Sequence, residues 1–245
     1  MIIISPISVA TLDNVFEDIG KGASLPNSSW KGEASAYFRL ESPVKQEPLV
    51  ALFKGSTPDG KVSLFSGGLG EAVPDGWLIQ FIPPPSVRNL WAMAPDRDRV
   101  QIETCHQGAA NYCLYSLERA LRGPEDGRLE TLIPGVAMAV VPSNPLKQMV
   151  PQLQTEAFLA NLHLPIHGPA QRIPFCPNTL QNKAERMNDL YNKKLFDRLN
   201  LSLGLESIRE GSKEPRLAGM PGSLDFSQER AGNRPCPSLP PLMKL

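Results

Sequence analysis

The chain has 245 residues, and its 25 Lys and Arg are balanced by 25 Asp and Glu, so the formal net charge is zero. Proteins that mainly bind the phosphate backbone of nucleic acids carry an excess of cations, and the balanced charge argues against that class. The 25 prolines are about twice ordinary usage. Because proline breaks helices and central strands, this content argues against a coiled coil or a helical bundle.

Short apolar segments bounded by Pro, Gly, Asn or Asp fill the first 145 residues. Such segments are typical of strands, and we expect strands over residues 34–40, 49–54, 61–65, 77–82 and 100–104. The sequence Thr57-Pro58-Asp59-Gly60 favours a turn, since Pro58 fixes its φ and Gly60 tolerates positive φ. It would join two of these strands as a hairpin. The pattern predicts a mainly β fold, a small barrel or sandwich of short strands.

One long helix is expected near the C-terminus, over residues 178–203. Its apolar side chains fall on one face at helical spacing: Ala184, Met187, Tyr191, Leu195 and Leu199. Gly204 is placed to end it. The apolar stripe serves either to dock within the chain or to bind a partner helix, and the sequence leaves both open.

The composition divides the chain into four parts. We predict a β-rich domain over 1–145, a Pro-rich connector over 146–177, a helical segment over 178–210 and a disordered tail over 211–245. Gly, Pro, Ser and charged residues dominate the tail, which therefore lacks the apolar surface needed to offset chain entropy.

Nothing in the sequence predicts export or membrane insertion. The apolar N-terminal residues are followed at once by Ser5 and Pro6, unlike a signal peptide. No apolar run approaches the roughly 18 residues of a membrane span. The four cysteines are widely spaced, and we expect free thiols in a reducing, intracellular compartment.

A metal site would have to draw on scattered Cys and His side chains: Cys105, His106, Cys113, His163, His167 and Cys176. The spacing of His163 and His167 resembles that in a zinc finger, but no closely spaced Cys pair precedes it. We therefore expect buried thiols and loop histidines, with no metal and no cofactor.

Catalytic constellations are equally weak. Cys113 or Ser116 could pair with a histidine as a nucleophile, but no Gly-x-Ser-x-Gly motif or family signature surrounds either. The dense carboxylates, Asp96 with Asp98 and Glu125 with Asp126, are interpreted as solvated turns. The glycine-rich loop at 66–70 runs into Pro74 rather than a helix, unlike a phosphate loop. We predict no catalytic residue and no enzymatic activity.

Five short motifs, in one order over residues 25–141, nevertheless resemble a known family, the non-catalytic C subunit of eukaryotic ribonuclease H2. The matching segments are Leu25-Pro26-Asn27, Lys31-Gly32-Glu33-Ala34 with Tyr37-Phe38, Phe53-Lys54-Gly55-Ser56, Val73-Pro74-Asp75-Gly76-Trp77, and Gly108-Ala109 followed by Arg122-Gly123-Pro124-Glu125, with Val136–Val141 in the place of the family's closing segment. The sequence departs from the family pattern at Asn27, Lys54 and Ser56, which replace a Cys and two Arg. The last hundred residues have no counterpart.

The resemblance implies a scaffolding subunit whose strands close a barrel shared with the B subunit, the pair docking on the catalytic A subunit. It implies action on RNA–DNA hybrids only through that complex, in the nucleus and without a membrane. Subunit-interface candidates are Tyr37, Phe38, Phe53, Lys54, Gly55 and Trp77. The alternative is a stand-alone structural or interaction protein, for example a viral matrix-like protein, with no enzymatic activity.

Overall fold

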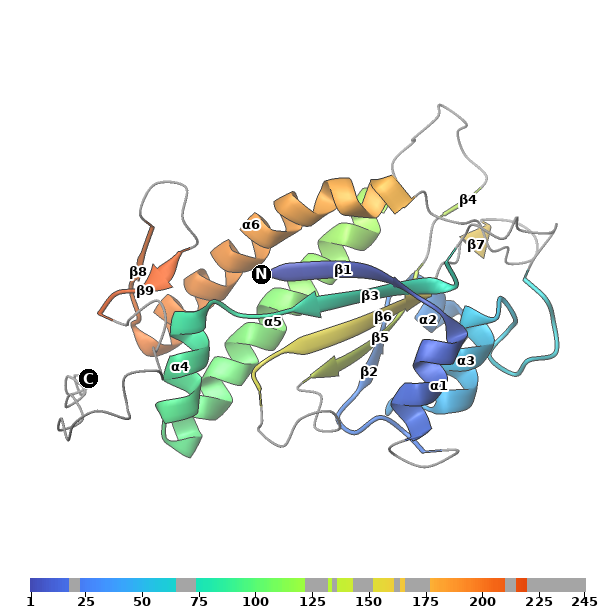
Figure 1. The fold of residues 1–245 in the computed structure, drawn as a ribbon, viewed down its shortest axis with the longest axis horizontal. Helices are drawn as coiled ribbons and strands as arrows, with labels where there is room; N and C mark the ends of the chain where they lie inside the picture. Colours follow the sequence, from blue (N-terminus) through green and yellow to red (C-terminus); the bar gives the residue numbers. More distant parts are fainter. Residues whose placement is uncertain are drawn as a thin grey trace, which may run out of the picture.

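A five-stranded antiparallel sheet forms the centre of the molecule, with strand order β1-β3-β6-β5-β2 (Figure 1). The computed structural model describes residues 1–17, 23–64, 74–121, 132–133, 136–142, 152–160, 164–165, 177–209 and 215–219. The strands are β1 (Ile2–Ile7), β2 (Ser29–Lys31), β3 (Gly76–Phe81), β5 (Ala137–Pro142) and β6 (Thr155–Ala160). Since β1 and β2 form two open edges, the described strands do not close into the predicted barrel.

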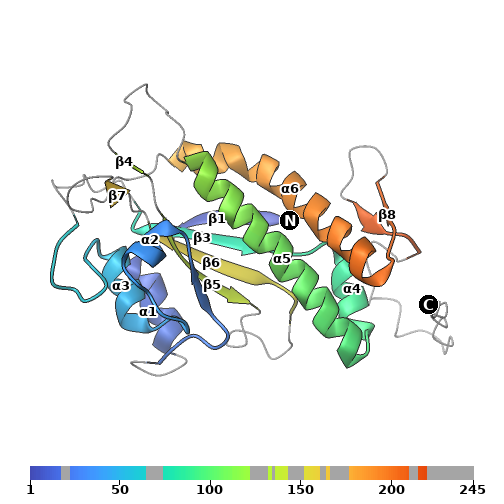
Figure 2. The ribbon, with the colours of Figure 1, turned by 180° about the vertical axis from the view of Figure 1, so that it is seen from behind.

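Helices cover both faces of this sheet. Two long helices, α5 (Asp96–Leu121) and α6 (Pro177–Leu203), run side by side across one face, with α4 (Pro85–Met93) at their end (Figure 2). The other face packs against α1 (Val9–Glu17), α2 (Glu33–Tyr37) and α3 (Gln46–Phe53). The predicted mainly β fold is therefore wrong, and the molecule is an antiparallel sheet between two helical layers.

The alternating side chains of β3 show that the sheet separates two hydrophobic cores. Trp77, Ile79 and Phe81 join the cluster under α5 and α6, whereas Leu78 joins the cluster under α1 and α3. Successive side chains of a strand point to opposite faces. Because both faces are covered, β5 and β6 are apolar at consecutive positions rather than at every second one.

The sequence prediction differs most from the structure at α5. Residues 100–104, expected to form a strand, lie in the first turns of this helix. No proline occurs within it, so the high overall proline content says nothing about this segment. Asp96 and Asp98 stand in its first turn, where carboxylates favour the helix dipole. Small residues on its buried side let α6 approach closely: a Cβ on Gly108 would lie 2.6 Å from Nη1 of Arg198.

The strands predicted over 34–40 and 49–54 are helices instead. In α3 the proline at position 48 falls in the first turn, where its missing N–H removes no helical hydrogen bond. Gly55, with φ of 73°, ends α3. Its N–H donates to the Leu52 carbonyl (3.0 Å), and the Ser56 N–H donates to the Ala51 carbonyl (2.9 Å). These are the two bonds of a Schellman cap.

Several predicted features are confirmed. β3 coincides with the strand expected over 77–82 to within one residue, and α6 with the helix expected over 178–203. Gly204 follows that helix with φ of 66°. The turn at 57–60 is present, with Gly60 at φ of 70° and the Thr57 N–H donating to the Val62 carbonyl (2.8 Å). It does not join two strands as predicted, because the segment before it is α3 and the segment after it forms only an isolated bridge between Ser63 and Ser56.

The chain beyond residue 131 contributes more ordered structure than the sequence predicts. The sheet strand β6 lies inside the segment assigned to a connector, although the four-part division itself stays a prediction. Two small ribbons pair β4 (Leu132–Ile133) with β7 (Leu164–Pro165), and β8 (Ser207–Ile208) with β9 (Arg216–Leu217). Leu217, within the predicted disordered tail, is buried and donates its N–H to Oγ of Ser86 (3.1 Å).

The glycine-rich loop at 66–70 and the pair Glu125 and Asp126 lie outside the described residues. No helix in the described part of the chain is long and apolar enough to cross a membrane.

Candidate functional site

The sheet face beneath α1 and α3 is mostly apolar, as the strand register shows. Side chains directly opposite one another on neighbouring strands form rows across a sheet. One row contains Ser5, Leu78, Phe158, Ala139 and Trp30, and the next contains Ile7, Gly76, Ala160 and Ala137. The Phe53 ring of α3 lies directly on Gly76. These rows form a packed core with Leu12 and Phe16 of α1.

A third row on the same face is polar at its centre. It contains Ile3, Gln80, Glu156 and Val141. Nε2 of Gln80 donates to Oε1 of Glu156 across 2.9 Å, and Glu156 is 6% exposed. Among the described strand residues of this face, Glu156 is the one acidic side chain. No sequence pattern indicates this pair, because its two residues are 76 positions apart in the chain.

His106 lies on the opposite face, in the core beneath α6. Its Nδ1 is 2.7 Å from the Tyr191 hydroxyl and its Nε2 is 2.9 Å from Oγ1 of Thr155 (β6). Burial lowers the pKa of His106 to about 3. The ring is therefore neutral at neutral pH with both nitrogens engaged, which fits a structural role rather than that of a metal ligand or a general base.

The cysteines of α5 are also structural. Cys105 and Cys113 are buried, and burial raises the pKa of Cys113 to about 12. A thiol held protonated is a poor nucleophile. Asp96 and Asp98 stand in the first turn of α5, where Oδ1 of Asp96 is 3.4 Å from Nη1 of Arg99. His163, His167 and Cys176 lie outside the described residues.

The six interface candidates do not gather in one place. Phe53 and Trp77 are fully buried and belong to different cores. Lys54 and Gly55 form the end of α3. Phe53 therefore serves core packing and Gly55 serves helix capping, while the assignment of these residues to a subunit interface stays a prediction.

Tyr37 is different, because it is an exposed aromatic side chain. It is 55% exposed at the end of α2, and its ring meets the edge of the Phe38 ring at 5.0 Å between centroids. Lys31 and Arg39, close to it in the chain, are exposed cations. Exposed aromatic rings beside cations are typical of surfaces that stack nucleic-acid bases and contact phosphates.

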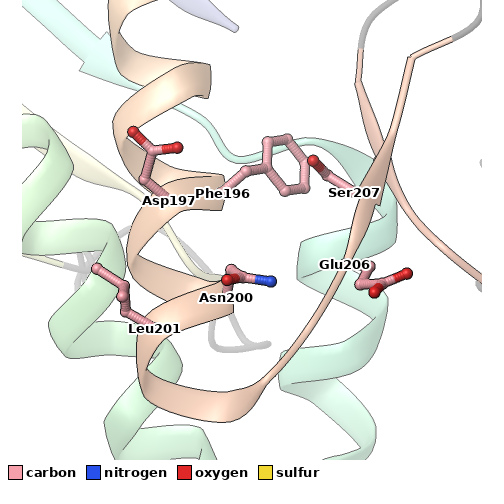
Figure 3. Close-up of a pocket in the computed structure, with 6 residues that line it drawn as sticks. All are labelled: Phe196, Asp197, Asn200, Leu201, Glu206 and Ser207. Carbon is pink, nitrogen blue, oxygen red and sulfur yellow. The ribbon is translucent and has the colours of Figure 1, made fainter.

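A pocket of about 560 Å³ lies far from this surface, between the end of α6 and the β8 strand (Figure 3). Its lining residues are Phe196, Asp197, Asn200, Leu201, Glu206 and Ser207. Phe196 is directed toward Ser207, whereas Asp197 and Leu201 lie on the other side of the helix turn. Two carboxylates and no cation among these residues make the pocket unsuited to phosphate groups.

Comparisons with known proteins give a consistent result. The family model described as TrwC relaxase matches residues 14–230, so it spans all the described helices beyond the first turn of α1. No curated protein matches the sequence. Solved structures of similar fold include the conjugative relaxase TrwC in complex with oriT DNA in a metal-bound form, with TM-score 0.68 and 18% identity over 89% of this chain and 75% of that one.

Two further structures of TrwC agree. The complex with a 27-mer DNA comprising the recognition hairpin and the cleavage site has TM-score 0.68 and 17% identity, over 89% of this chain and 75% of that one. A copper-bound complex with oriT DNA has TM-score 0.66 and 18% identity, over 89% and 76%.

These findings overturn the resemblance to ribonuclease H2. The predicted partners, its A and B subunits, the RNA–DNA hybrid and the nuclear location rested on that resemblance and are wrong with it. The alternative of a structural or matrix-like protein is not supported either. The prediction that the chain is not an enzyme is also corrected, since relaxases are DNA-nicking enzymes.

The metal of the solved complexes can be tested against the residues of this chain. A transition metal needs three or four N, O or S donors converging on one point. The described residues contain no group of three His, Cys, Asp or Glu side chains that could hold a metal ion. The polar row offers one carboxylate, already bound by an amide. The described residues therefore do not fit such a metal.

Proposed function

The chain belongs to the TrwC relaxase family, and from this premise we propose that it binds the DNA of a transfer origin and nicks one strand. The match of the family model over residues 14–230 carries the proposal. The sheet and its two helical layers support it, since the same arrangement recurs in relaxases solved with oriT DNA.

We propose further that DNA contacts the side of the molecule that carries α2. Tyr37 presents an exposed ring there, and Arg39 and Lys31 are exposed cations close to it in the chain. Single-stranded DNA is bound by stacking of bases on aromatic rings and by cations along the backbone. The acidic pocket near β8 has no cation among its lining residues.

Tyr37→Ala tests this contact in a DNA-binding assay. A stacked base contributes about 1–3 kcal/mol, so the substitution is expected to weaken binding of a hairpin with a single-stranded tail by roughly 5- to 150-fold. Fluorescence anisotropy with a labelled hairpin measures it. The matched control is Tyr115→Ala, because Tyr115 is 56% exposed but lies on α5, on the opposite helical layer. Equal weakening by both variants would show that α2 is not the contact.

Arg39→Ala tests the phosphate contact separately. Each phosphate neutralised on a single strand contributes about 0.7 to the slope of log affinity against log salt. We expect Arg39→Ala to reduce that slope by about this amount. Arg119→Ala, which removes an exposed cation of α5, is expected to leave it unchanged. A slope unaffected by Arg39→Ala would remove Arg39 from the proposed surface.

Nicking is tested with the same DNA. A labelled single-stranded tail following the hairpin is incubated with the protein, and a shortened labelled product is expected on a denaturing gel. Because the origin sequence is unspecified, the tail carries a randomised region, and the products are sequenced. Binding and nicking indistinguishable from those of an unrelated protein of equal charge would contradict the proposed function.

A further inference from the structure

The solved relaxases of similar fold include metal-bound and copper-bound complexes. We infer that the sheet of the present chain takes up no such metal ion and that its DNA binding needs none. The second part rests on the proposed function, whereas the first concerns only the side chains of the sheet.

The donor set of the polar row is too small. The row crosses β1, β3, β6 and β5, and its side chains are those of Ile3, Gln80, Glu156 and Val141. Only Glu156 is a carboxylate, and Oε1 of this group accepts the Gln80 amide at 2.9 Å. The two flanking positions are aliphatic and supply no donor. A transition metal would meet one carboxylate and one amide. This is fewer than the three or four protein ligands that such an ion usually has.

The two neighbouring rows that contain Phe158 and Ala160 cannot complete the set. The next row places Leu78 and Phe158 side by side at the centre of the sheet. The Phe53 ring covers Gly76 in the row beyond, and Leu12 and Phe16 belong to the same core. The space over these rows is filled by packed apolar side chains, which do not bind metal ions.

His106, the one histidine among the described residues, contacts β6 from the opposite face of the sheet. Its Nε2 is 2.9 Å from Thr155 Oγ1, and Thr155 points away from the face of Glu156 because it precedes it in the strand. The sheet itself separates the imidazole from the carboxylate. Both ring nitrogens are engaged, so His106 cannot turn to join the row.

Calorimetric titration of the whole chain with Mn²⁺, Ni²⁺ or Cu²⁺ tests the first part. We expect no saturable binding of one equivalent of metal ion to the side chains of the sheet. Saturable uptake by the wild type that is lost in Glu156→Ala would overturn the inference. Uptake that persists in Glu156→Ala would place the ion elsewhere and leave the sheet free of metal, as inferred.

A converse variant tests the explanation through the donor set. Gln80→His with Val141→His places an imidazole on each strand beside Glu156, so three donors face one another across β3, β6 and β5. We expect this variant to take up one equivalent of Ni²⁺. If it keeps the wild-type circular dichroism spectrum yet takes up none, the missing donors are not the reason. Should it fail to fold, the wild-type titration still decides.

DNA binding tests the second part and separates it from the proposed function. The anisotropy titration is repeated in EDTA and in excess Mn²⁺, and equal affinities are expected. Affinity that falls more than tenfold in EDTA would overturn the inference while supporting DNA binding. Absence of DNA binding in both conditions would instead contradict the proposed function, and the calorimetric result would stand by itself.

Discussion

Burial of His106 makes a specific prediction about stability and pH. The folded-state pKa is about 3 because of burial, against about 6.5 in an unfolded chain. Above pH 6.5 the imidazole is neutral in both states. As the pH falls below 6.5, the unfolded chain binds a proton that the folded chain does not, so the folded state loses stability progressively down to about pH 3.

The size of the effect follows from the two pKa values. One pKa unit corresponds to about 1.36 kcal/mol. Between pH 7.5 and 5.0 the unfolded imidazole becomes almost fully protonated while the folded one stays neutral. His106 should therefore cost the protein about 2 kcal/mol of unfolding free energy over this interval.

Urea denaturation at pH 7.5 and 5.0, for the wild type and for His106→Gln, measures this contribution. At pH 7.5 the variant should be less stable by about 1–3 kcal/mol, because the Tyr191 and Thr155 hydroxyls lose a well-placed partner. Between pH 7.5 and 5.0 the variant should lose about 2 kcal/mol less unfolding free energy than the wild type, because all other titrating groups are the same in both proteins. An equal loss in both proteins would refute the assignment of a neutral buried imidazole.

Three further substitutions test the packing. Trp77→Ala removes a fully buried ring of β3 and should lower the unfolding free energy by about 3–5 kcal/mol in urea; a loss below about 1 kcal/mol would contradict its burial. Gly32→Ala places a Cβ against the Val136 carbonyl at a φ of 93°. Gly60→Ala is its control, because Gly60 also has a positive φ but has open surroundings. Gly60→Ala should lower the unfolding free energy by about 1 kcal/mol, and Gly32→Ala should lower it clearly more. Leu217→Asp puts a charge in a buried position of β9 and should lower the melting temperature; an unchanged value would show that β9 does not pack.

Elements with a clear local signature could be predicted from the sequence. α6 has large apolar side chains at helical spacing and a glycine at its end, and β3 has a buried apolar run after a turn. The buried stripe of α5 also keeps helical spacing, from Ile102 to Leu121. It is a weaker signal than the stripe of α6, because Cys105, Ala109 and Cys113 in its middle are small side chains.

The segments at 34–40 and 49–54 were misassigned for a different reason. Each is short, and a run of five to eight apolar residues fits a buried strand and a buried helix equally well. In α3, the packing of Leu49, Leu52 and Phe53 against the sheet stabilises the helix. Local helix and strand propensities alone do not distinguish the two structures.

The polar row was beyond prediction, because Gln80 and Glu156 are 76 residues apart in the chain. Only the pairing of β3 with β6 makes them neighbours. The ribonuclease H2 resemblance failed because short motifs built from turn and cap residues recur in unrelated folds. Asp75 illustrates this: its carboxylate accepts the Val9 N–H at 2.9 Å, so it contacts the first residue of α1 from 66 positions away in the chain.

Net charge was also misleading as a guide to function. A total of zero sums over the whole surface and does not report how charges are distributed. Lys31 and Arg39 are exposed near Tyr37, whereas Asp197 and Glu206 line the pocket near β8, so the local charge differs between these two places although the total is zero.

The most direct measurement is the affinity of the whole chain for a labelled DNA hairpin with a single-stranded tail, determined in EDTA. We expect saturable binding that weakens as the salt concentration rises. Tyr37→Ala should reduce the affinity, whereas Tyr115→Ala should not. Absence of saturable binding at low salt, with the protein folded by circular dichroism, would contradict the proposed function.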